Sequence, residues 1–211
     1  MSKKFVALTF DDGPNTTVTP LVLDLLEQFG IRASFFLIGE NIRGEAVRVA
    51  ERARDMGCDI CNHSFTHPAM PNLSKDQMEE EIRKTDDRIR EITGETTRFF
   101  RPPYIAVSDL VYDTVDKIFI CGQGCEDWIP ETSVQKRIDL TLGNMKDGMM
   151  VLLHDSAENY RTVEALKTII PELLKQDYEF LTVSELFERR GVTPKPHEHV
   201  IYTVVGNTQG D

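Results

Sequence analysis

The sequence predicts an α/β fold in which about seven parallel strands alternate with helices and the sheet curls toward a barrel. Three observations predict it. Short apolar runs alternate regularly with amphipathic stretches, no linker or low-complexity block interrupts them, and 211 residues suffice for one large domain but not for two. We therefore expect one domain over residues 1–193 and a tail over residues 194–211.

Each expected strand is a short apolar run, and each expected helix carries apolar residues at helical spacing. Ser74, with Gln77 three residues later, is expected to cap a helix, and Pro171 is expected to bend or break one. The strands are expected at residues 5–10, 33–38, 58–61, 98–101, 117–121, 149–153 and 179–181, with a candidate edge strand at 200–205. The helices are expected at residues 17–29, 45–56, 74–92, 108–115, 133–145, 162–176 and 183–190.

The charge of the chain excludes some partners. With 24 Lys and Arg against 35 Asp and Glu, the net charge is −11, which argues against nucleic acid and anionic membranes. No apolar run reaches the length of a membrane span, and the first residues lack the pattern of an export signal. We expect a cytoplasmic protein for the chain as given, or a secreted one if a leader was removed.

Two adjacent carboxylates, Asp11 and Asp12, follow the first expected strand and precede Gly13 and Pro14. Asp side chains are almost never buried without a partner. A metal ion would be a partner for one of them, and the other would then be free to act as a general base. Asp-Asp-Gly-Pro is also typical of a simple turn, which is the alternative.

Polar residues also follow the later strands, and the carboxyl ends of parallel strands are where such folds carry their active sites. Three of the five histidines and the only tryptophan lie there. The residues are Asn62, His63 and His67, then Arg101 and Tyr104, then Asp127 and Trp128, and finally His154 and Asp155.

His63 and His67 have i, i+4 spacing, which on one helical turn directs both imidazoles to a common point. Pro68 disfavours helical geometry at His67, so we expect a single turn and no longer helix. Two histidines and a carboxylate from another strand make a three-ligand site with open positions, as hydrolytic metals use. Histidines at this spacing are also often incidental, and it is the Asp doublet that favours ligation.

Three further side chains have alternatives of their own. Arg101, fixed before Pro102, is suited to pairing with a carboxylate and lowering its pKa, or else forms a surface ion pair. His154 follows three apolar residues, so it is either a core histidine or, beside Asp155 at the rim, an acid or base. Trp128 either packs in the core or stacks on a sugar.

Together these residues resemble the polysaccharide deacetylases of carbohydrate esterase family 4, the NodB homology domain. The resemblance covers about residues 4–190 and implies a distorted (β/α) barrel. Five motifs carry it, in the order of that family: Thr9-Phe10-Asp11-Asp12-Gly13-Pro14, His63-Ser64-Phe65-Thr66-His67, Arg101-Pro102-Pro103-Tyr104, Asp127-Trp128 and Leu152-Leu153-His154-Asp155.

The resemblance implies a divalent metal ion held by Asp12, His63 and His67. The ion would most often be zinc (Zn2+), with Co2+, Ni2+ or Fe2+ as alternatives that these ligands also accept. By the same resemblance Asp11 is the catalytic base, and Arg101 orients it.

On the other side of the implied site, His154 would be the general acid and Asp127 would orient it. The backbone N–H of Tyr104 would stabilise the oxyanion. Trp128 and Leu152 would line the pocket for the acetyl group, and Tyr104 would also contact the substrate.

One position departs from the pattern of the family. Members often carry an acid three residues before the Asp of the Asp-Trp motif, and this chain has Gly124 there. We expect the catalytic roles to be unaffected and the shape of the loop and the contacts with substrate to differ.

The four cysteines have two interpretations. Cys58 with Cys61, and Cys121 with Cys125, have spacings that a four-thiolate zinc site could use. Both pairs fall in or beside expected core strands, which favours free, partly buried thiols and a reducing compartment.

The functional hypothesis is a metal-dependent hydrolase that removes acetyl groups, through amide cleavage, from N-acetylated sugars such as chitooligosaccharides or peptidoglycan-type polysaccharides. The expected partner is thus an acetylated carbohydrate. One alternative is an esterase that removes O-acetyl groups from xylan. Another is a catalytically silent carbohydrate-binding domain, against which the presence of Asp11, Arg101 and His154 argues.

Overall fold

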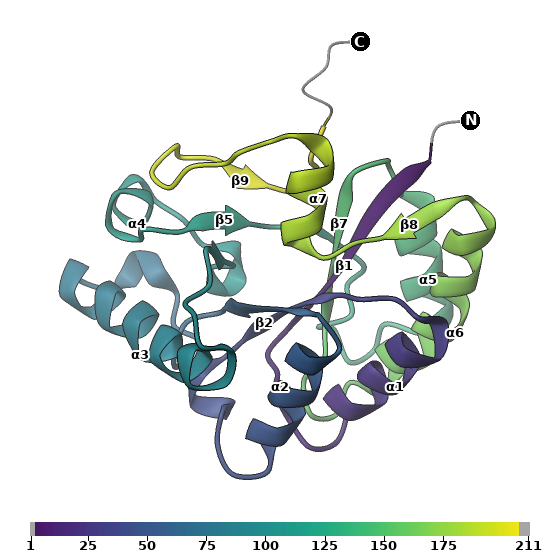
Figure 1. Ribbon diagram of the computed structural model, residues 1–211, viewed down its shortest axis with the longest axis horizontal. Coiled ribbons are helices and arrows are strands. Elements are labelled where there is room, and N and C mark those ends of the chain that lie inside the picture. Colours follow the sequence, from purple (N-terminus) through teal and green to yellow (C-terminus); the bar gives the residue numbers. More distant parts are fainter. Residues whose placement is uncertain (1–2, 207–211) are drawn as a thin grey trace.

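The apolar run near the N-terminus forms strand β1, Lys4–Asp11, whose residues from Val6 onward are buried. In this computed structural model, which describes residues 3–206, β1 lies near the middle of the sheet (Figure 1). It pairs in parallel with β2 (Ser34–Leu37), β7 (Met149–His154) and β8 (Tyr178–Phe180). Burial by neighbours on every side explains why β1 is almost continuously apolar.

The other strands extend the sheet on both sides of β1. In sheet order they run β6-β7-β1-β2-β3-β4-β5-β9, with β8 paired to β1, and all these pairings are parallel. The predicted α/β barrel-like fold is confirmed. The described residues form nine strands where about seven were expected, because two-residue strands β6 and β9 add to them. The remaining strands are β3 (Asp59–Asn62), β4 (Phe99–Phe100), β5 (Ile118–Ile120), β6 (Gln123–Gly124) and β9 (Ile201–Tyr202).

Seven α-helices among the described residues connect the strands, and α3, α2, α1, α6 and α5 follow one another around the outside of the sheet (Figure 1). The capping box of Ser74 and Gln77 is present at the start of α3. Pro171 does not break α6, since Ile169, Ile170 and Leu173 on either side of it stay buried in the core. The helices are α1 (Thr19–Phe29), α2 (Ala46–Asp55), α3 (Lys75–Thr93), α4 (Asp109–Thr114), α5 (Val134–Gly143), α6 (Tyr160–Lys175) and α7 (Val183–Arg190).

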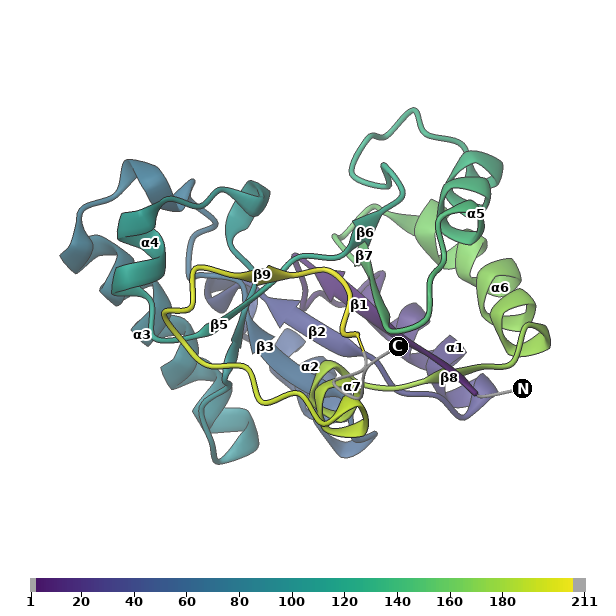
Figure 2. The same cartoon turned by 90° about the horizontal axis from the view of Figure 1, so that it is seen from above.

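The segment after α7 returns to the sheet. Its strand β9 pairs with β5, and Figure 2 shows the segment running on from there toward β7. Thr203 O accepts a hydrogen bond from Met150 N (3.0 Å), and Val205 N donates to Gly148 O (2.8 Å). Residues 201–205 therefore connect two distant strands of the curled sheet. The remainder of the expected tail, residues 207–211, and residues 1–2 of the expected domain lie outside the described part of the chain.

Side chains of β1 alternate between two layers of the core. Val6, Leu8 and Phe10 pack in the cluster beneath the outer helices, whereas Ala7 lies in the inner cluster with α7. Because successive side chains of a strand point to opposite faces, Asp11 shares the inner face with Ala7. The strand thus delivers a carboxylate to the inner, carboxyl-terminal end of the barrel. Within residues 3–206, no helix combines the length and the apolar character needed to span a bilayer.

Candidate active site

Asp12, His63 and His67 converge at the carboxyl ends of β1 and β3. Asp12 Oδ1 lies 3.6 Å from His63 Nε2 and 3.5 Å from His67 Nε2. Ligands about 2.0–2.1 Å from a tetrahedral zinc ion are about 3.4 Å from one another. Among residues 3–206, this is the one group of three or more such side chains whose ligand atoms lie close enough to share an ion.

Two observations show that these residues fit a metal ion. Asp12 Oδ1 is buried and has no hydrogen-bond partner, which is costly unless a cation pairs with it. His63 Nδ1 lies 2.7 Å from the backbone O of Arg101, an acceptor, so Nδ1 must carry the proton and Nε2 is left with a free lone pair. Burial, with the charge of His63, lowers the pKa of His67, which favours the neutral form that binds metals.

The loop that carries the two histidines is not the helical turn that the spacing predicted. Ser64 and His67 have positive φ angles of 64° and 60°, and residues 63–67 contain no helix. The N–H groups of Phe65 and Thr66 donate to Glu81 Oε2 of α3 at 2.8 and 2.7 Å instead of to helical carbonyls. The prediction was wrong because this carboxylate, distant in the sequence, sets the backbone path. The two imidazole rings are nevertheless 4.9 Å apart.

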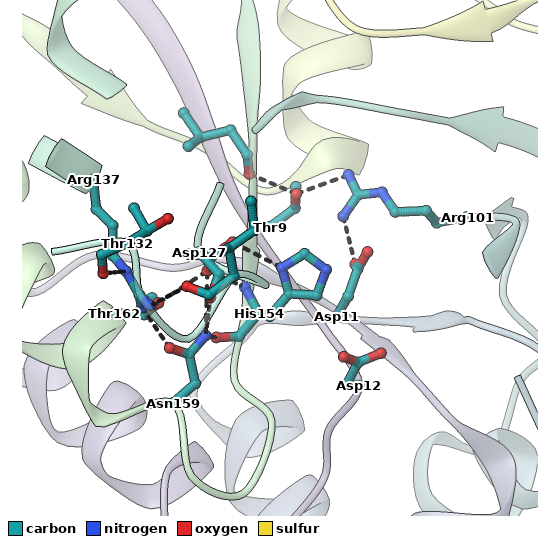
Figure 3. A network of polar contacts seen from close by, with 12 residues as sticks. Thr9, Asp11, Asp12, Arg101, Asp127, Thr132, Arg137, His154, Asn159 and Thr162 are labelled. Carbon is teal, nitrogen blue, oxygen red and sulfur yellow. Dashed lines mark hydrogen bonds and ion pairs between the residues drawn. The ribbon is translucent and has the colours of Figure 1, made fainter. Parts of the chain in front are cut away.

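Asp11 is held by Arg101, which follows β4. Arg101 Nη1 donates to Asp11 Oδ1 at 2.6 Å, and both side chains are almost fully buried. The guanidinium also donates to Thr9 Oγ1 at 2.8 Å (Figure 3). It stacks over the ring of Phe36 as well. Burial alone would raise the pKa of Asp11, but the charges of Arg101, His63 and His154 outweigh it and lower this pKa. Asp11 is therefore ionised at neutral pH.

His154, at the end of β7, is held by Asp127. Asp127 Oδ1 lies 2.8 Å from His154 Nδ1, and Asp127 Oδ2 accepts from the backbone N of His154 (2.7 Å) and from Thr162 Oγ1 (2.9 Å). Burial opposes the charged imidazole, but the hydrogen bond and charge of Asp127, with Asp11 and Asp12, raise the pKa of His154 to about 9. The ring is therefore protonated at neutral pH.

These groups share one pocket of about 510 Å³. The site residues expected from the sequence line it directly, except for Arg101 and Asp127, which lie behind its wall. Tyr104 adopts a left-handed conformation (φ 58°), and its ring packs 4.7 Å from that of His67. Trp128 packs edge-on against His154 at 5.7 Å. Leu152 of β7 completes an apolar part of the wall. The structure thus brings together all ten residues that the motifs singled out as a candidate site.

Gly124, where the family often has an acid, lies against the tryptophan. A Cβ at this position would lie 2.8 Å from Trp128 Cζ3 and 3.1 Å from Trp128 Cη2. A side chain here would displace the indole ring, so the glycine and the present position of Trp128 depend on each other.

Sequence analysis missed the residues that support the site from outside the pocket. Thr162 and Asn159 contact the Asp127–His154 pair, and Thr9, which the first motif contains but to which no role was given, contacts Arg101. Asp155 was noted at the rim, but its carboxylate is fully buried and accepts from Thr19 Oγ1 at 2.5 Å. The position of Asn159 just before a helix was the one available sign, since residues that precede helices often donate and accept locally.

The cysteines are free thiols. Cys58, Cys61 and Cys125 are buried, and Cys121 is half-buried in the wall of the pocket. Burial raises the pKa of Cys58 to about 11 and that of Cys125 to about 12, so both are protonated. Within the described residues the four sulfurs do not gather into a group that could hold an ion, so the four-thiolate alternative fails.

Comparison with known families decides the identity. The sequence profile of the family described as polysaccharide deacetylase matches residues 1–118 of this chain. The chain belongs to the polysaccharide deacetylase family. The resemblance drawn from the five motifs is thereby confirmed.

The names of the relatives of this chain refer to more than one polymer. This polysaccharide deacetylase is 44% identical over 193 residues to the bifunctional xylanase/deacetylase of Pseudobutyrivibrio xylanivorans, covering 92% of this chain but 32% of that protein. It is 36% identical over 192 residues to a peptidoglycan-N-acetylglucosamine deacetylase of Bacillus cereus, covering 88% and 89%. A family 4 acetyl xylan esterase from Clostridium thermocellum, solved with a cobalt ion, matches with a TM-score of 0.93 and 38% identity over 96% of this chain and 99% of that one.

Proposed function

We propose that this polysaccharide deacetylase is a metal-dependent hydrolase that removes acetyl groups from an acetylated polysaccharide. The observation that carries the proposal is the triangle of Asp12, His63 and His67, with the unpartnered, buried Oδ1 of Asp12 at its apex. Beside it lie an ionised carboxylate, Asp11, and a protonated imidazole, His154. A base and an acid next to a cation site are what the hydrolysis of an acyl group requires.

The three ligands would hold one divalent ion, and we propose Zn2+, whose preference for nitrogen and carboxylate donors they suit. Co2+, Ni2+ and Fe2+ have overlapping ligand preferences. When bound, such an ion would polarise the acetyl carbonyl and lower the pKa of a nearby water. His63, locked in one tautomer by the backbone O of Arg101, is already oriented for this task.

Asp11 would take the proton from the attacking water. Its pKa is lowered, so it is ionised over the whole neutral range and available as a base. Arg101 orients Asp11 because the ion pair fixes one carboxylate oxygen and leaves Oδ2 directed toward the ligands, 3.7 Å from His63 Nε2.

His154 would give a proton to the departing sugar oxygen or nitrogen, since a poor leaving group must be protonated as its bond to the acyl carbon breaks. Asp127 fixes the ring through Nδ1, so Nε2 is the atom left to donate the proton. The backbone N–H of Tyr104 would donate to the developing oxyanion, and Trp128 and Leu152 would surround the acetyl methyl group.

The substrate is best sought among acetylated xylans first. The relative with 44% identity is named a xylanase/deacetylase, and the structural match at TM-score 0.93 is an acetyl xylan esterase. N-acetylated sugars, which the sequence hypothesis placed first, are the second candidate because the Bacillus cereus relative is named for N-acetylglucosamine in peptidoglycan. The two reactions pass through the same tetrahedral oxyanion, so the site chemistry serves both.

The test measures acetate release from acetylated xylan and from N-acetylglucosamine oligomers, with added Zn2+ and with a chelator. We expect release that chelator and Asp12→Asn both abolish. His154→Ala should lower kcat by about 10² to 10⁴-fold with little change in KM. Activity that survives both chelation and Asp12→Asn refutes the proposal. Binding of oligosaccharide without acetate release in the presence of Zn2+ would instead support the silent binding domain.

A further inference from the structure

A second hollow adjoins the candidate pocket. It has a volume of about 470 Å³ and lies over the start of α6. Trp128 lines both spaces. On one side of it lies the candidate pocket with His154, and on the other lies the hollow, which Tyr160 and Arg161 also line. A polymer whose acetylated unit occupies the pocket therefore has a neighbouring place for the next sugar, on the far side of the indole.

The hollow has two exposed aromatic walls. Trp128 is 54% exposed and Tyr160 is 49% exposed. Exposed large apolar side chains that gather around a cavity mark a binding surface more often than isolated ones do. Rigid rings with an apolar face and a polar edge match the alternating apolar and hydroxyl-bearing surfaces of a sugar ring.

Two guanidinium groups line the same hollow without a carboxylate partner. Arg137 of α5 is buried, and its hydrogen-bond partners within residues 3–206 are uncharged: Thr162 Oγ1 at 2.8 Å, Asn159 Oδ1 at 2.5 Å, and the backbone O of Thr132 and of Ile129 (Figure 3). Arg161 Nη1 donates to the backbone O of Pro130.

In the described part of the chain, neither nearby acid forms a direct ion pair with these two arginines. Asp127 is engaged by His154 and Thr162, and Glu158, which also lines the hollow, is not within ion-pair distance of either guanidinium in the described structure. Burial lowers the pKa of Arg137; the charge of Asp127 acts in the opposite direction, and the positive charge of Arg161 adds to the lowering. The hollow is thus lined by two arginines and two acids, and Arg161 is its exposed cation.

We propose that this hollow binds a carboxylate on the sugar next to the one that is deacetylated, so that the enzyme prefers acidic polysaccharides. The inference rests on the proposed function, because it takes the polymer to run from the pocket across Trp128. Arg161 would pair with the carboxylate, Arg137 would add its charge from beneath, and Tyr160 would stack on the sugar ring. The carboxylate would be that of a uronic acid in a xylan or that of the lactyl group of a muramic acid that carries no stem peptide.

Binding of deacetylated oligosaccharides tests this without relying on catalysis. Titration calorimetry on the metal-free protein would compare a xylotetraose with the same oligomer carrying one glucuronic acid branch. A second pair would compare a glucosamine tetramer with an alternating glucosamine–muramic acid tetramer. We expect the acidic member of one pair to bind about tenfold or more tightly than its neutral counterpart, and the pair that shows it identifies the source of the carboxylate.

The variants are Arg161→Gln and, as a matched control on the exposed side of the same helix, Lys167→Gln. Arg161→Gln should reduce the acidic preference to about twofold or less, whereas Lys167→Gln should keep it. Tyr160→Ala should weaken acidic and neutral members alike. Equal binding of acidic and neutral oligomers by the natural protein, or a preference that survives Arg161→Gln, overturns the inference. An acidic preference in a protein that releases no acetate would instead reject the proposed function and leave only the binding of a carboxylate in the hollow standing.

Discussion

Asp11 and His154 are register partners on the adjacent parallel strands β1 and β7. Partners in neighbouring strands project to the same face, so the fold sets the proposed base and acid side by side at the ends of two core strands. Arg101 holds one and Asp127 holds the other (Figure 3). Their environments drive the two pKa values in opposite directions, downward for Asp11 and up to about 9 for His154. One group is thus ionised and the other protonated over the same range of pH, as acid–base catalysis requires.

Asp127→Asn should shift the alkaline limit of activity to lower pH. The substitution removes the charge and the acceptor that hold the pKa of His154 near 9, while burial continues to lower it. The general acid then loses its proton at lower pH. The pH dependence of kcat/KM measures the shift, and the titration of the His154 ring by NMR in the metal-free protein reports it without catalysis.

Asp139→Asn, on the exposed face of α5, is the control for Asp127→Asn and should leave both curves in place. The stability of the metal-free protein gives a second check. The protonated His154 ring makes its full contribution to the free energy of unfolding below its unfolded pKa of 6.5. This contribution is lost as pH rises from 6.5 to about 9. An unchanged alkaline limit in Asp127→Asn would show that another group donates the proton.

Arg101→Met should destabilise the fold and move the acid limit of activity to higher pH. Breaking a buried ion pair leaves Asp11 as an uncompensated buried charge, which costs about 3–5 kcal/mol. In the natural protein the ionised Asp11 carboxylate contributes to stability above its unfolded pKa of 3.8. This contribution is lost as pH falls through the lower pKa of the folded state. Without Arg101, burial raises that pKa, so Asp11 is protonated at higher pH.

Urea unfolding and the pH dependence of kcat/KM measure the two effects of Arg101→Met. Arg83→Met on the exposed face of α3, where Arg83 pairs with Asp87, should change the free energy of unfolding by less than about 1 kcal/mol. If Arg101→Met kept the acid limit of the natural protein, Asp11 would not be the group that titrates there.

The sequence predicted what depends on neighbouring residues. Apolar runs such as 149–153 became strands because burial acts on each run directly, and the acids and histidines at their ends met because parallel strands end at one edge. Ser74 capped α3 because its partner, Gln77, lies only three residues away.

Contacts between distant segments account for what the sequence did not predict. The path of residues 63–67 depends on Glu81, and β6 exists because Gln123 and Gly124 meet β7. Arg137 offers no local sign that it is buried among residues of α6, 25 positions away in the case of Thr162. Periodicity and motif spacing carry no information on such pairs, which the folded topology alone brings together.

Glu81→Ala should weaken metal binding although Glu81 is not a ligand. Its carboxylate accepts the N–H groups of Phe65 and Thr66 and the hydroxyl of Thr66, at 2.7–2.8 Å. Without it, the loop between His63 and His67 loses the contacts that fix its non-helical path. Groups that orient metal ligands are worth about 10- to 100-fold in affinity, so we expect a loss of about tenfold.

Titration with Zn2+ against a competing chelator measures the loss in Glu81→Ala. The control is Glu80→Ala, whose side chain pairs with Lys84 on the exposed face of the same helix. Glu81→Gln keeps the size of the side chain, so its affinity for Zn2+ should fall between those of Glu80→Ala and Glu81→Ala. Equal affinities in Glu80→Ala and Glu81→Ala would show that the loop holds its shape unaided.

Gly13→Ala should strain the loop of the two aspartates, and Asp155→Ala should relieve part of that strain. A Cβ on Gly13 would lie 2.7 Å from Asp155 Oδ2 and 2.9 Å from Oδ1, far inside contact distance. The carboxylate cannot simply move away, because Oδ2 accepts from Thr19 Oγ1 (2.5 Å) and the backbone N of Asp155 donates to Asp11 O (3.1 Å). We expect Gly13→Ala to lower the free energy of unfolding by about 1–3 kcal/mol.

A double-mutant cycle on the metal-free protein isolates this contact. Asp155→Ala alone should also destabilise, since it leaves the buried hydroxyl of Thr19 without its acceptor. In the double variant the new methyl group enters the space of the lost carboxylate, so the combined loss should be smaller than the sum of the two, by about 0.5–3 kcal/mol. Gly143→Ala, where a Cβ meets nothing within 4 Å, is the control. Strict additivity in urea unfolding would mean that the loop accommodates the methyl group without pressing on Asp155.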